Sequence, residues 1–433
     1  MTTHIGRRNT CAARIATLGI ALIAFSATAQ NNGSNNQQAL PRYAVIDLGT
    51  LGGTYSNAYG INNNGWVTGM STLPGDTEVH TFLWRNGVMH DLGTLGGENS
   101  YAGFSPNQEG DLGGLAETST PDPLGENYCG SGTICLPLVW HNGVKTPLPT
   151  LGGSNGAAQG MNARGVVPGV AENTTPDPAC NAPQVLQGRP VLWEPVLAVA
   201  IPPKGAIHEL PVYPGDTEGA AHMINDKGQA TGWSGTCAKT ALGFANFHAL
   251  VWENGRAIYL GSLGGTLNTQ GLGINNRGQV AGYGDLAGDT TFHAFLWQDG
   301  VMSDLGTLPG DMASGADGLN NLGQVVGGSW DASWNGRAVI WQDGVVTDLN
   351  TLIPPDSPLY LLEAQGTIND FGWIAGYAWV ISTGEVHAFL ATPTREIWPV
   401  NESQKVVLPD NVRNLLQQHR RFGGPGGWPI GPH

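Results

Sequence analysis

Short stretches in which apolar and polar residues alternate recur along the chain, and tight turns separate them. The clearest set predicts four strands, at residues 272–275, 279–283, 293–297 and 301–305. The first pair surrounds Asn276-Arg277-Gly278, and the second pair surrounds Asp299-Gly300. Asp-Gly suits a two-residue hairpin because both central residues of that turn adopt positive φ. The pattern therefore predicts a unit of four short antiparallel strands.

The motif Asn-x-x-Gly-x-x-x-Gly spans the first hairpin of this unit and occurs seven times. Its asparagines are Asn62, Asn107, Asn162, Asn225, Asn275, Asn320 and Asn369. A period of about 50 residues is typical of propellers and other repeat arrays. Four antiparallel strands per repeat form one propeller blade. The sequence therefore predicts an all-β fold, a seven-bladed β-propeller of four-stranded antiparallel blades over residues 42–391.

The last repeat lacks its fourth strand, because no Asn-Gly turn and no further alternating stretch follow Ala391. An unpaired strand lies instead at Tyr43 to Leu48, and its ending Asp47-Leu48-Gly49 matches Asp91-Leu92-Gly93. We expect this N-terminal strand to complete the last blade and close the ring. Closure removes the open sheet edges that would otherwise invite aggregation.

Two sequence signatures resemble a known family. They are His293-Ala294-Phe295-Leu296-Trp297 and the segment Asp-Leu-Gly-Thr-Leu-Gly-Gly at 47–53 and 91–97. Both are similar to the repeats of the HAF-repeat family of extracellular bacterial proteins, and the similarity covers residues 42–391. The resemblance implies an exported repeat protein and no particular activity. Copies two and three depart most from the pattern, since Leu136 and Arg189 stand where His293 stands in copy five, and Glu194-Pro195 replaces the Asn-Gly turn of copy three. We expect those blades to be irregular.

Residues 1–29 have the features of a signal peptide. Arg7, Arg8 and Arg14 precede the apolar run 15–25, and Ala27-Thr28-Ala29 offers the small residues at which signal peptidases cleave. Cleavage near Ala29 predicts a secreted protein, extracellular or periplasmic. An uncleaved anchor is the alternative, but about 11 apolar residues are too few for the ~20 that a membrane helix needs. No later stretch is long and apolar enough to span a membrane in the mature chain.

The two segments that flank the predicted propeller are polar or rich in Gly and Pro. Residues 30–41 predict a flexible leader. Residues 392–433 form a C-terminal tail with a short helix expected over Asp410 to Arg421, ended by Gly423. Whether this tail docks on the propeller stays open at the level of sequence.

Composition narrows the classes of function. The 65 glycines and 28 prolines fit many short strands joined by tight turns. A formal charge of -15, with only 19 Lys and Arg spread along the chain, argues against binding nucleic acid. We expect a monomer.

Loss of the signal peptide removes Cys11 and leaves four cysteines. An even number in an exported protein favours disulfides. Cys129 and Cys135 close a small loop, and Cys180 and Cys237 then form the second pair. A zinc site is the alternative, although the spacings are unlike CxxC and no His lies beside them.

The repeat separates two faces. Turns within the first and third hairpins of each blade lie on one face and are expected to be short, whereas the loops between second and third strands lie on the other face and vary. Long loops in blades two to four hold all four mature cysteines. Function tends to reside in such loops. The candidate ligand-binding residues on this face are Asp122, Glu126, Tyr128, Glu172, Asp177, Trp233, Phe247, Trp330 and Trp334.

Carboxylates beside aromatic rings suit sugar binding. The recurring histidines His80, His248, His293 and His387 could suggest a metal ring, but Leu136, Arg189 and Arg337 hold the equivalent positions in other copies. We therefore expect these histidines to bond the backbone of a neighbouring blade, and the aspartates Asp47, Asp91, Asp304 and Asp348 to accept from nearby backbone amides. No metal and no cofactor is predicted.

Catalytic motifs are missing from the sequence. It contains no HExxH, EF-hand, phosphate-binding loop or Gly-x-Ser-x-Gly elbow. These observations predict an exported binding or interaction module whose ligand is carbohydrate or another extracellular protein. A propeller hydrolase or lyase acting on polysaccharide, and a structural surface protein without a small ligand, are the alternatives.

Overall fold

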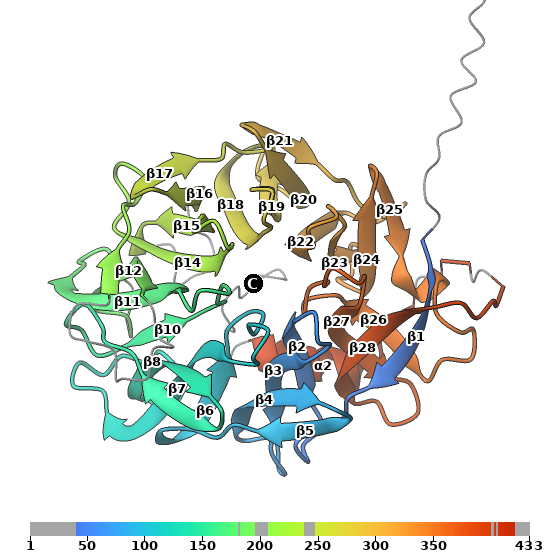
Figure 1. Cartoon of the computed structure of the whole chain (residues 1–433), viewed down its shortest axis with the longest axis horizontal. Coiled ribbons are helices and arrows are strands. Elements are labelled where there is room, and N and C mark those ends of the chain that lie inside the picture. Colours follow the sequence, from blue (N-terminus) through green and yellow to red (C-terminus); the bar gives the residue numbers. More distant parts are fainter. Residues whose placement is uncertain are drawn as a thin grey trace, which may run out of the picture. The chain divides into compact units, whose positions relative to one another are not determined.

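The computed structural model describes residues 40–180, 182–194, 207–237, 247–399, 402–403 and 406–420. The predicted signal peptide, most of the leader and the end of the tail lie outside the described residues. The described residues, from Leu40 onward, form one compact unit. In it, seven four-stranded antiparallel sheets surround a common axis (Figure 1). This arrangement is a seven-bladed β-propeller and confirms the predicted fold.

The first four blades follow one another in chain order from the innermost strand outward. Blade one is β2 (Ser56–Ile61), β3 (Val67–Thr72), β4 (Val79–Arg85) and β5 (Val88–Asp91). Blade two is β6 (Gly96–Ala102), β7 (Leu112–Pro121), β8 (Thr133–His141) and β9 (Val144–Pro147). Blade three is β10 (Gly156–Ala158), β11 (Val167–Pro176), β12 (Leu186–Trp193) and β13 (Ile207–Glu209). Blade four is β14 (Glu218–Ile224), β15 (Ala230–Gly235), β16 (His248–Glu253) and β17 (Arg256–Tyr259).

The remaining three blades complete the ring. Blade five is β18 (Gly264–Ile274), β19 (Val280–Leu286), β20 (Phe292–Gln298) and β21 (Val301–Asp304). Blade six is β22 (Ala313–Leu319), β23 (Val325–Trp330), β24 (Gly336–Gln342) and β25 (Val345–Asp348), followed by a 3-10 turn, η1 (Leu349–Thr351). Blade seven is β26 (Leu359–Glu363), β27 (Ile374–Val380), β28 (Val386–Thr394) and the N-terminal strand β1 (Arg42–Asp47). A tail helix, α2 (Asp410–Arg420), follows.

Strand β1 closes the ring as predicted. It pairs antiparallel with β28 from Arg42 opposite Thr394 to Asp47 opposite Phe389. Tyr43 is 1% exposed and packs in a core cluster with residues of blades six and seven. The Tyr43 amide also donates to the Leu352 carbonyl over 3.0 Å. The last blade therefore joins the two ends of the propeller.

Close packing within each blade explains the second glycine of the repeat. In blade five a Cβ on Gly282 would lie 1.9 Å from the Gln270 carbonyl oxygen on the neighbouring strand. On the third strand of blades two, three and four, a tryptophan ties the blade to the chain that enters it. The indole of Trp193 donates to the Pro149 carbonyl over 2.8 Å, and that of Trp252 to the Pro211 carbonyl over 2.7 Å. Glycine and tryptophan thus have structural roles at fixed places in the repeat.

The two faces of the propeller differ as expected, with one exception. We call the face of the Asn-x-x-Gly turns the hairpin face, and the face of the loops between second and third strands the loop face. The first hairpins vary in length, with residues 364–373 between β26 and β27. The hairpins between third and fourth strands are short except in blade three, where residues 194–206 connect β12 to β13. The expectation of uniformly short hairpins is wrong there, because Glu194-Pro195 replaces the Asn-Gly turn, and most of this segment lies outside the described residues.

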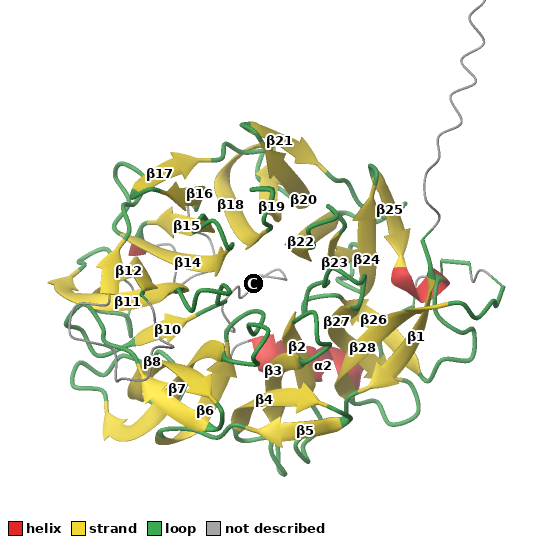
Figure 2. Ribbon diagram, viewed as in Figure 1, coloured by secondary structure: helices red, strands yellow, loops and turns green. Residues whose placement is uncertain are grey.

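The tail docks on the loop face. Leu408, Val412 and Leu416 are buried in one cluster with Tyr55 and Tyr377. Leu408 also donates its amide to the Asn335 side chain over 3.1 Å. Val412 and Leu416 are four residues apart, which places their side chains on one side of α2. Figure 2 draws this helix in red. Among the described residues, no helix is long and apolar enough to span a membrane.

Both predicted disulfides are present, Cys129–Cys135 and Cys180–Cys237. Each pins a long connection on the loop face. Disulfides of this kind are consistent with an extracellular or periplasmic protein.

Candidate functional site

The repeated asparagine shapes each hairpin on the ring axis. In blade one the Asn62 side-chain oxygen accepts from the backbone amides of Asn64 and Trp66, each over 3.0 Å. Gly65 completes the turn at φ 73°, a conformation that favours glycine. Asparagine is suited to this place because its side chain satisfies amides of its own turn. The other six copies make the same pair of bonds.

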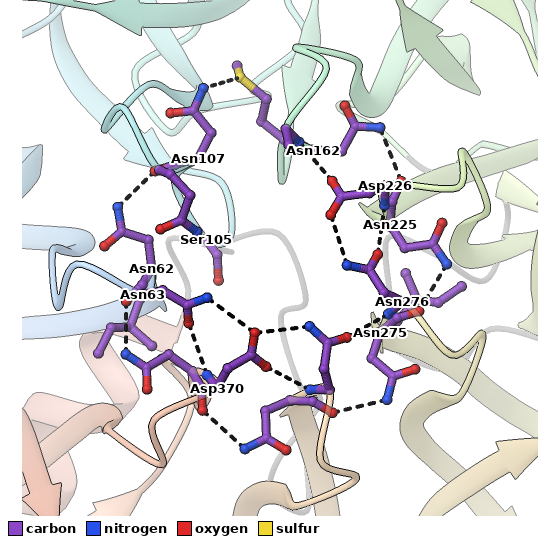
Figure 3. Close-up of a pocket in the computed structure, with 18 of the residues that line it drawn as sticks. Asn62, Asn63, Ser105, Asn107, Asn162, Asn225, Asp226, Asn275, Asn276 and Asp370 are labelled. Atoms are coloured by element: carbon purple, nitrogen blue, oxygen red, sulfur yellow. Dashed lines mark hydrogen bonds between the residues drawn. The ribbon is translucent and has the colours of Figure 1, made fainter.

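The same asparagines link the blades in a ring (Figure 3). The Asn62 side-chain nitrogen donates to the Asn107 carbonyl over 2.8 Å. Five more such bonds continue around the axis, from Asn162, Asn225, Asn275, Asn320 and Asn369, the last returning to the Asn62 carbonyl. Asn107 departs, because its nitrogen contacts Asp111 at 3.1 Å and the Met161 sulfur at 3.5 Å. The seven hairpins are thus locked to one another near the axis.

A second polar layer is formed by the residue after each asparagine. The Asn321 amide donates to Asp370 over 2.9 Å, and the Asp370 amide donates to the Asn63 side chain over 3.0 Å. On the opposite side of the ring, the Asp226 amide donates to Asn276 over 2.9 Å, and the Asn276 side chain returns a bond of 2.8 Å to Asp226. Side-chain amides and two carboxylates therefore surround the axis on the hairpin face.

These two layers line a cavity of about 310 Å³. Its wall holds the seven repeat asparagines, the residues that follow them and a few apolar side chains such as Met161 and Ile274. The volume lies at the lower end for small-ligand sites. Asp370 is an anion there: burial raises its pKa, but hydrogen bonds from Asn321 and Asn63 outweigh burial and leave the pKa below its usual value. Such a lining can donate to and accept from the hydroxyl groups of a small polar ligand.

The predicted carboxylates of the loop face converge at another place, around Asn155. The Asn155 side-chain nitrogen lies 3.0 Å from Asp122, 3.4 Å from Glu126 and 3.3 Å from Glu172. Its oxygen accepts from the Cys135 amide over 2.9 Å, which ties blade two to blade three. Glu126 and Glu172 are 0% exposed and Asp122 is 8% exposed.

Backbone amides engage this acidic cluster. Glu126 accepts from the amides of Val185 and Leu186 over 2.7 and 2.8 Å. Asp122 accepts from the Leu124 amide over 2.8 Å, and Glu172 from the Asn155 amide over 2.8 Å. Each carboxylate thus holds a loop or a strand of its own chain. Their role in ligand binding stays a prediction.

Burial makes Glu172 a weaker acid than usual, and this makes the stability of the fold depend on pH. Burial, assisted by the charge of Glu126, raises the pKa of Glu172 to about 7. Because the pKa of Glu172 is higher in the folded than in the unfolded protein, the contribution of this group to stability is fully present below about pH 4.5. That contribution is lost as the pH rises through 7. We expect the free energy of unfolding to fall by on the order of 2 kcal/mol between pH 5 and pH 8 from this group.

Chemical denaturation at both pH values tests the origin of that loss. Glu172→Gln, which mimics the protonated acid, is expected to lose less stability over the interval than the unchanged protein. Some loss will remain, since burial and the charge of Asp289 also raise the pKa of Asp285 to about 7. An equal pH dependence in the variant would contradict the assignment to Glu172.

The other six predicted residues are dispersed over the loop face. Tyr128 lies near the acidic cluster. Burial raises the pKa of its hydroxyl, and the charges of Glu172, Glu218 and Glu126 raise it further. Asp177 caps its loop by accepting from the Ala179 amide over 2.9 Å. Trp233 and Phe247 contact each other with ring centroids 4.3 Å apart.

Trp330 and Trp334 lie in blade six. Trp334 stacks on Phe292 with centroids 6.1 Å apart. Trp330 is 1% exposed, so its ring is buried. It is covered because it packs in the same aromatic group, 6.2 Å from Phe292.

One group of metal-binding side-chain types occurs among the described residues: Cys180, Glu218 and Cys237, with ligand atoms within 4.8 Å of one another. Both sulfurs are joined in the disulfide. A thiolate is the form that binds a metal, so the disulfide takes up the two ligands that such a site would need.

The recurring histidines have a different partner from the one expected. His80, His293 and His387 pair with Asp91, Asp304 and Asp47 at 2.9 Å within their own blades. The expectation of a neighbouring blade's backbone is wrong, because the outer strand brings an aspartate beside each ring. These aspartates also accept from the amide two residues on, as predicted, at 2.8 Å from Asp47 to Gly49.

No protein-family model and no curated protein matches the chain. Solved structures with similar chains include the β-propeller domain of the Trilobed protease from Pyrococcus furiosus, at 12% identity and a TM-score of 0.42 over 67% of this chain and 82% of that one. A gluconolactonase from Xanthomonas campestris has 10% identity and a TM-score of 0.37 over 83% and 96%. The lectin of Aleuria aurantia has 11% identity and a TM-score of 0.33 over 70% and 99%. Likenesses of this size say nothing about ligand or activity.

Sequence reasoning assigned the repeat asparagines a structural role and missed the cavity that they surround. The signal that could have revealed it is the next residue, which is polar in six of seven copies: Asn63, Gln108, Asp226, Asn276, Asn321 and Asp370, with Ala163 as the exception. Seven-fold repetition places such a position around one axis.

Proposed function

We propose that this protein is an exported binding module that takes a carbohydrate in the axial pocket of its hairpin face. The observation that carries the proposal is the pocket of about 310 Å³, whose wall presents side-chain amides and two carboxylates among apolar side chains. Sugar hydroxyls both donate and accept, and amide groups offer both partners in fixed directions. The second layer is preorganised, since Asn276, Asn321 and Asp370 are already held by neighbouring hairpins. Preorganisation lowers the entropic cost of binding.

A binding role suits this pocket better than catalysis. Its two carboxylates, Asp226 and Asp370, belong to blades four and seven, and each is engaged by amides of the ring. The buried acids around Asn155 instead accept hydrogen bonds from backbone amides. Export of the mature chain and membership of the HAF-repeat family are part of the same proposal.

A pocket-filling substitution tests the proposal. Ala163 lines the pocket, is exposed and contributes only its backbone amide, which donates to Asp226 over 3.0 Å. Ala163→Trp is expected to fill the pocket without removing a side-chain hydrogen bond. On a panel of neutral and acidic oligosaccharides, affinity should fall about tenfold or more, equivalent to ~1.4 kcal/mol.

Ala332→Trp is the matched control, because Ala332 is exposed in a loop on the opposite face. It should bind oligosaccharides as the unchanged protein does. Equal loss in both variants, or no glycan bound by the unchanged protein, would overturn the proposal. Release of sugar products that Glu126→Gln abolishes would favour the polysaccharide hydrolase or lyase instead.

A further inference from the structure

The tips of the axial hairpins differ in character around the pocket. Each tip residue directly follows a residue of the pocket wall. Blades three, four and five carry exposed cations there: Arg164, Lys227 and Arg277. The next two blades carry Leu322, 66% exposed, and Phe371, 65% exposed. The rim of the pocket therefore combines a basic arc with an adjoining apolar edge.

The side chains of Arg164 and Arg277 each extend to the axial hairpin of the next blade. The Arg164 guanidinium nitrogen is 2.8 Å from where a Cβ on Gly228 would lie, at the tip of blade four. That of Arg277 is 2.6 Å from the corresponding point on Gly323, at the tip of blade six. The positive groups therefore gather over blades four to six beside the pocket.

The basic arc is free to meet a ligand. Among the described residues, none of the ion pairs of Lys or Arg involves these three side chains. The opposing charges nearby are Asp226, Asp370 and Glu109. Asp226 and Asp370 are engaged by ring amides, and Glu109 is at the tip of blade two, next to the arc. In a chain of formal charge -15, three consecutive cations at one repeat position stand apart from the rest.

We propose that the carbohydrate bound here is acidic, a glycan that carries carboxylates on its sugar rings. This proposal rests on the axial pocket being a carbohydrate site. Guanidinium groups recognise planar carboxylates through paired hydrogen bonds. The exposed ring of Phe371 offers an apolar surface for the C–H face of a sugar, and the pocket amides meet its hydroxyls.

Calorimetry with two matched trisaccharides tests the inference. α-1,4-Linked trigalacturonate and α-1,4-linked galactotriose differ only at C6, which is a carboxylate in the first sugar and a hydroxymethyl group in the second. The full mature protein should bind trigalacturonate about tenfold more tightly at low salt, and this preference should shrink at 0.5 M salt because exposed charges are screened. Arg164→Gln with Arg277→Gln should reduce the preference to about twofold and leave galactotriose binding unchanged.

Arg256→Gln with Arg395→Gln removes two exposed cations outside the arc and should keep the preference. Equal affinity for both sugars would overturn the acidic-glycan inference and leave the carbohydrate pocket standing. Binding of triglutamate as tight as that of trigalacturonate would also overturn it, in favour of an acidic peptide. If neither sugar bound, the pocket proposal would fall with it.

Discussion

Replacing Tyr43 with alanine is expected to lower the free energy of unfolding by about 3 to 5 kcal/mol, the cost of truncating a fully buried aromatic side chain. Tyr43 is 1% exposed and packs against the core of blades six and seven from the strand that closes the ring. The loss falls at the point where the first and last segments of the propeller meet. Chemical denaturation of the mature, oxidised protein measures it.

Tyr43→Phe is the matched control. The Tyr43 hydroxyl is buried and has no hydrogen-bond partner among the described residues. Removing it should leave stability unchanged or raise it slightly, because a buried unsatisfied hydroxyl costs free energy. A loss below about 1 kcal/mol for Tyr43→Ala would mean that β1 is not an integral part of the last blade.

Replacing Arg337 with alanine is expected to cost about 3 to 5 kcal/mol, because it leaves buried carboxylates without their cation. Arg337 is 4% exposed and lies 2.7 Å from Asp311 and 3.6 Å from Asp348. It also donates to the Ser403 hydroxyl over 2.7 Å, which ties the tail to blade six. The midpoint of chemical denaturation should therefore fall well below that of the unchanged protein.

Arg189 offers a control at the same repeat position in blade three. It pairs with Glu209 at 2.7 Å, but the Glu209 side chain is 44% exposed. Exposed ion pairs contribute about 1 kcal/mol or less, so Arg189→Ala should cost much less than Arg337→Ala. Arg337→His should give an intermediate loss, since histidine pairs with the matching aspartate in blades one, five and seven. Equal losses for the two alanine variants would contradict the role of burial.

The sequence predicts the propeller because its repeat carries the information several times. Asn-x-x-Gly and the Asp-Gly or Asn-Gly turn mark both hairpins of most blades, and the unpaired strand at Tyr43 shows where the ring closes. Cysteine pairing follows from an even count and the short Cys129–Cys135 spacing. The second hairpin of blade three cannot be predicted in the same way, because Glu194-Pro195 replaces the turn residues found there in other blades.

The site is harder to predict, because a local pattern does not show which face of the ring holds a cavity. Long loops suggested the loop face, yet Glu126 turns inward to accept from a backbone amide of the neighbouring blade. Glu172 turns inward to accept from the Asn155 amide of its own blade. Asp226 and Asp370 lie in the Asn-x-x-Gly turns, and only closure of the ring brings them around one pocket. Burial decides the role of the loop-face carboxylates, and the meeting of residues far apart in sequence forms the axial pocket. A short stretch of sequence shows neither of these features.

Amide hydrogen exchange with and without saturating trigalacturonate tests the axial pocket most directly. The pocket account predicts slower exchange on binding in the hairpin segments 274–278, 319–323 and 368–372, which line or border the cavity. It predicts no change in the loop 122–132 or in the described residues of the loop 177–185. Protection confined to those two loops, with none in the hairpins, would contradict the account.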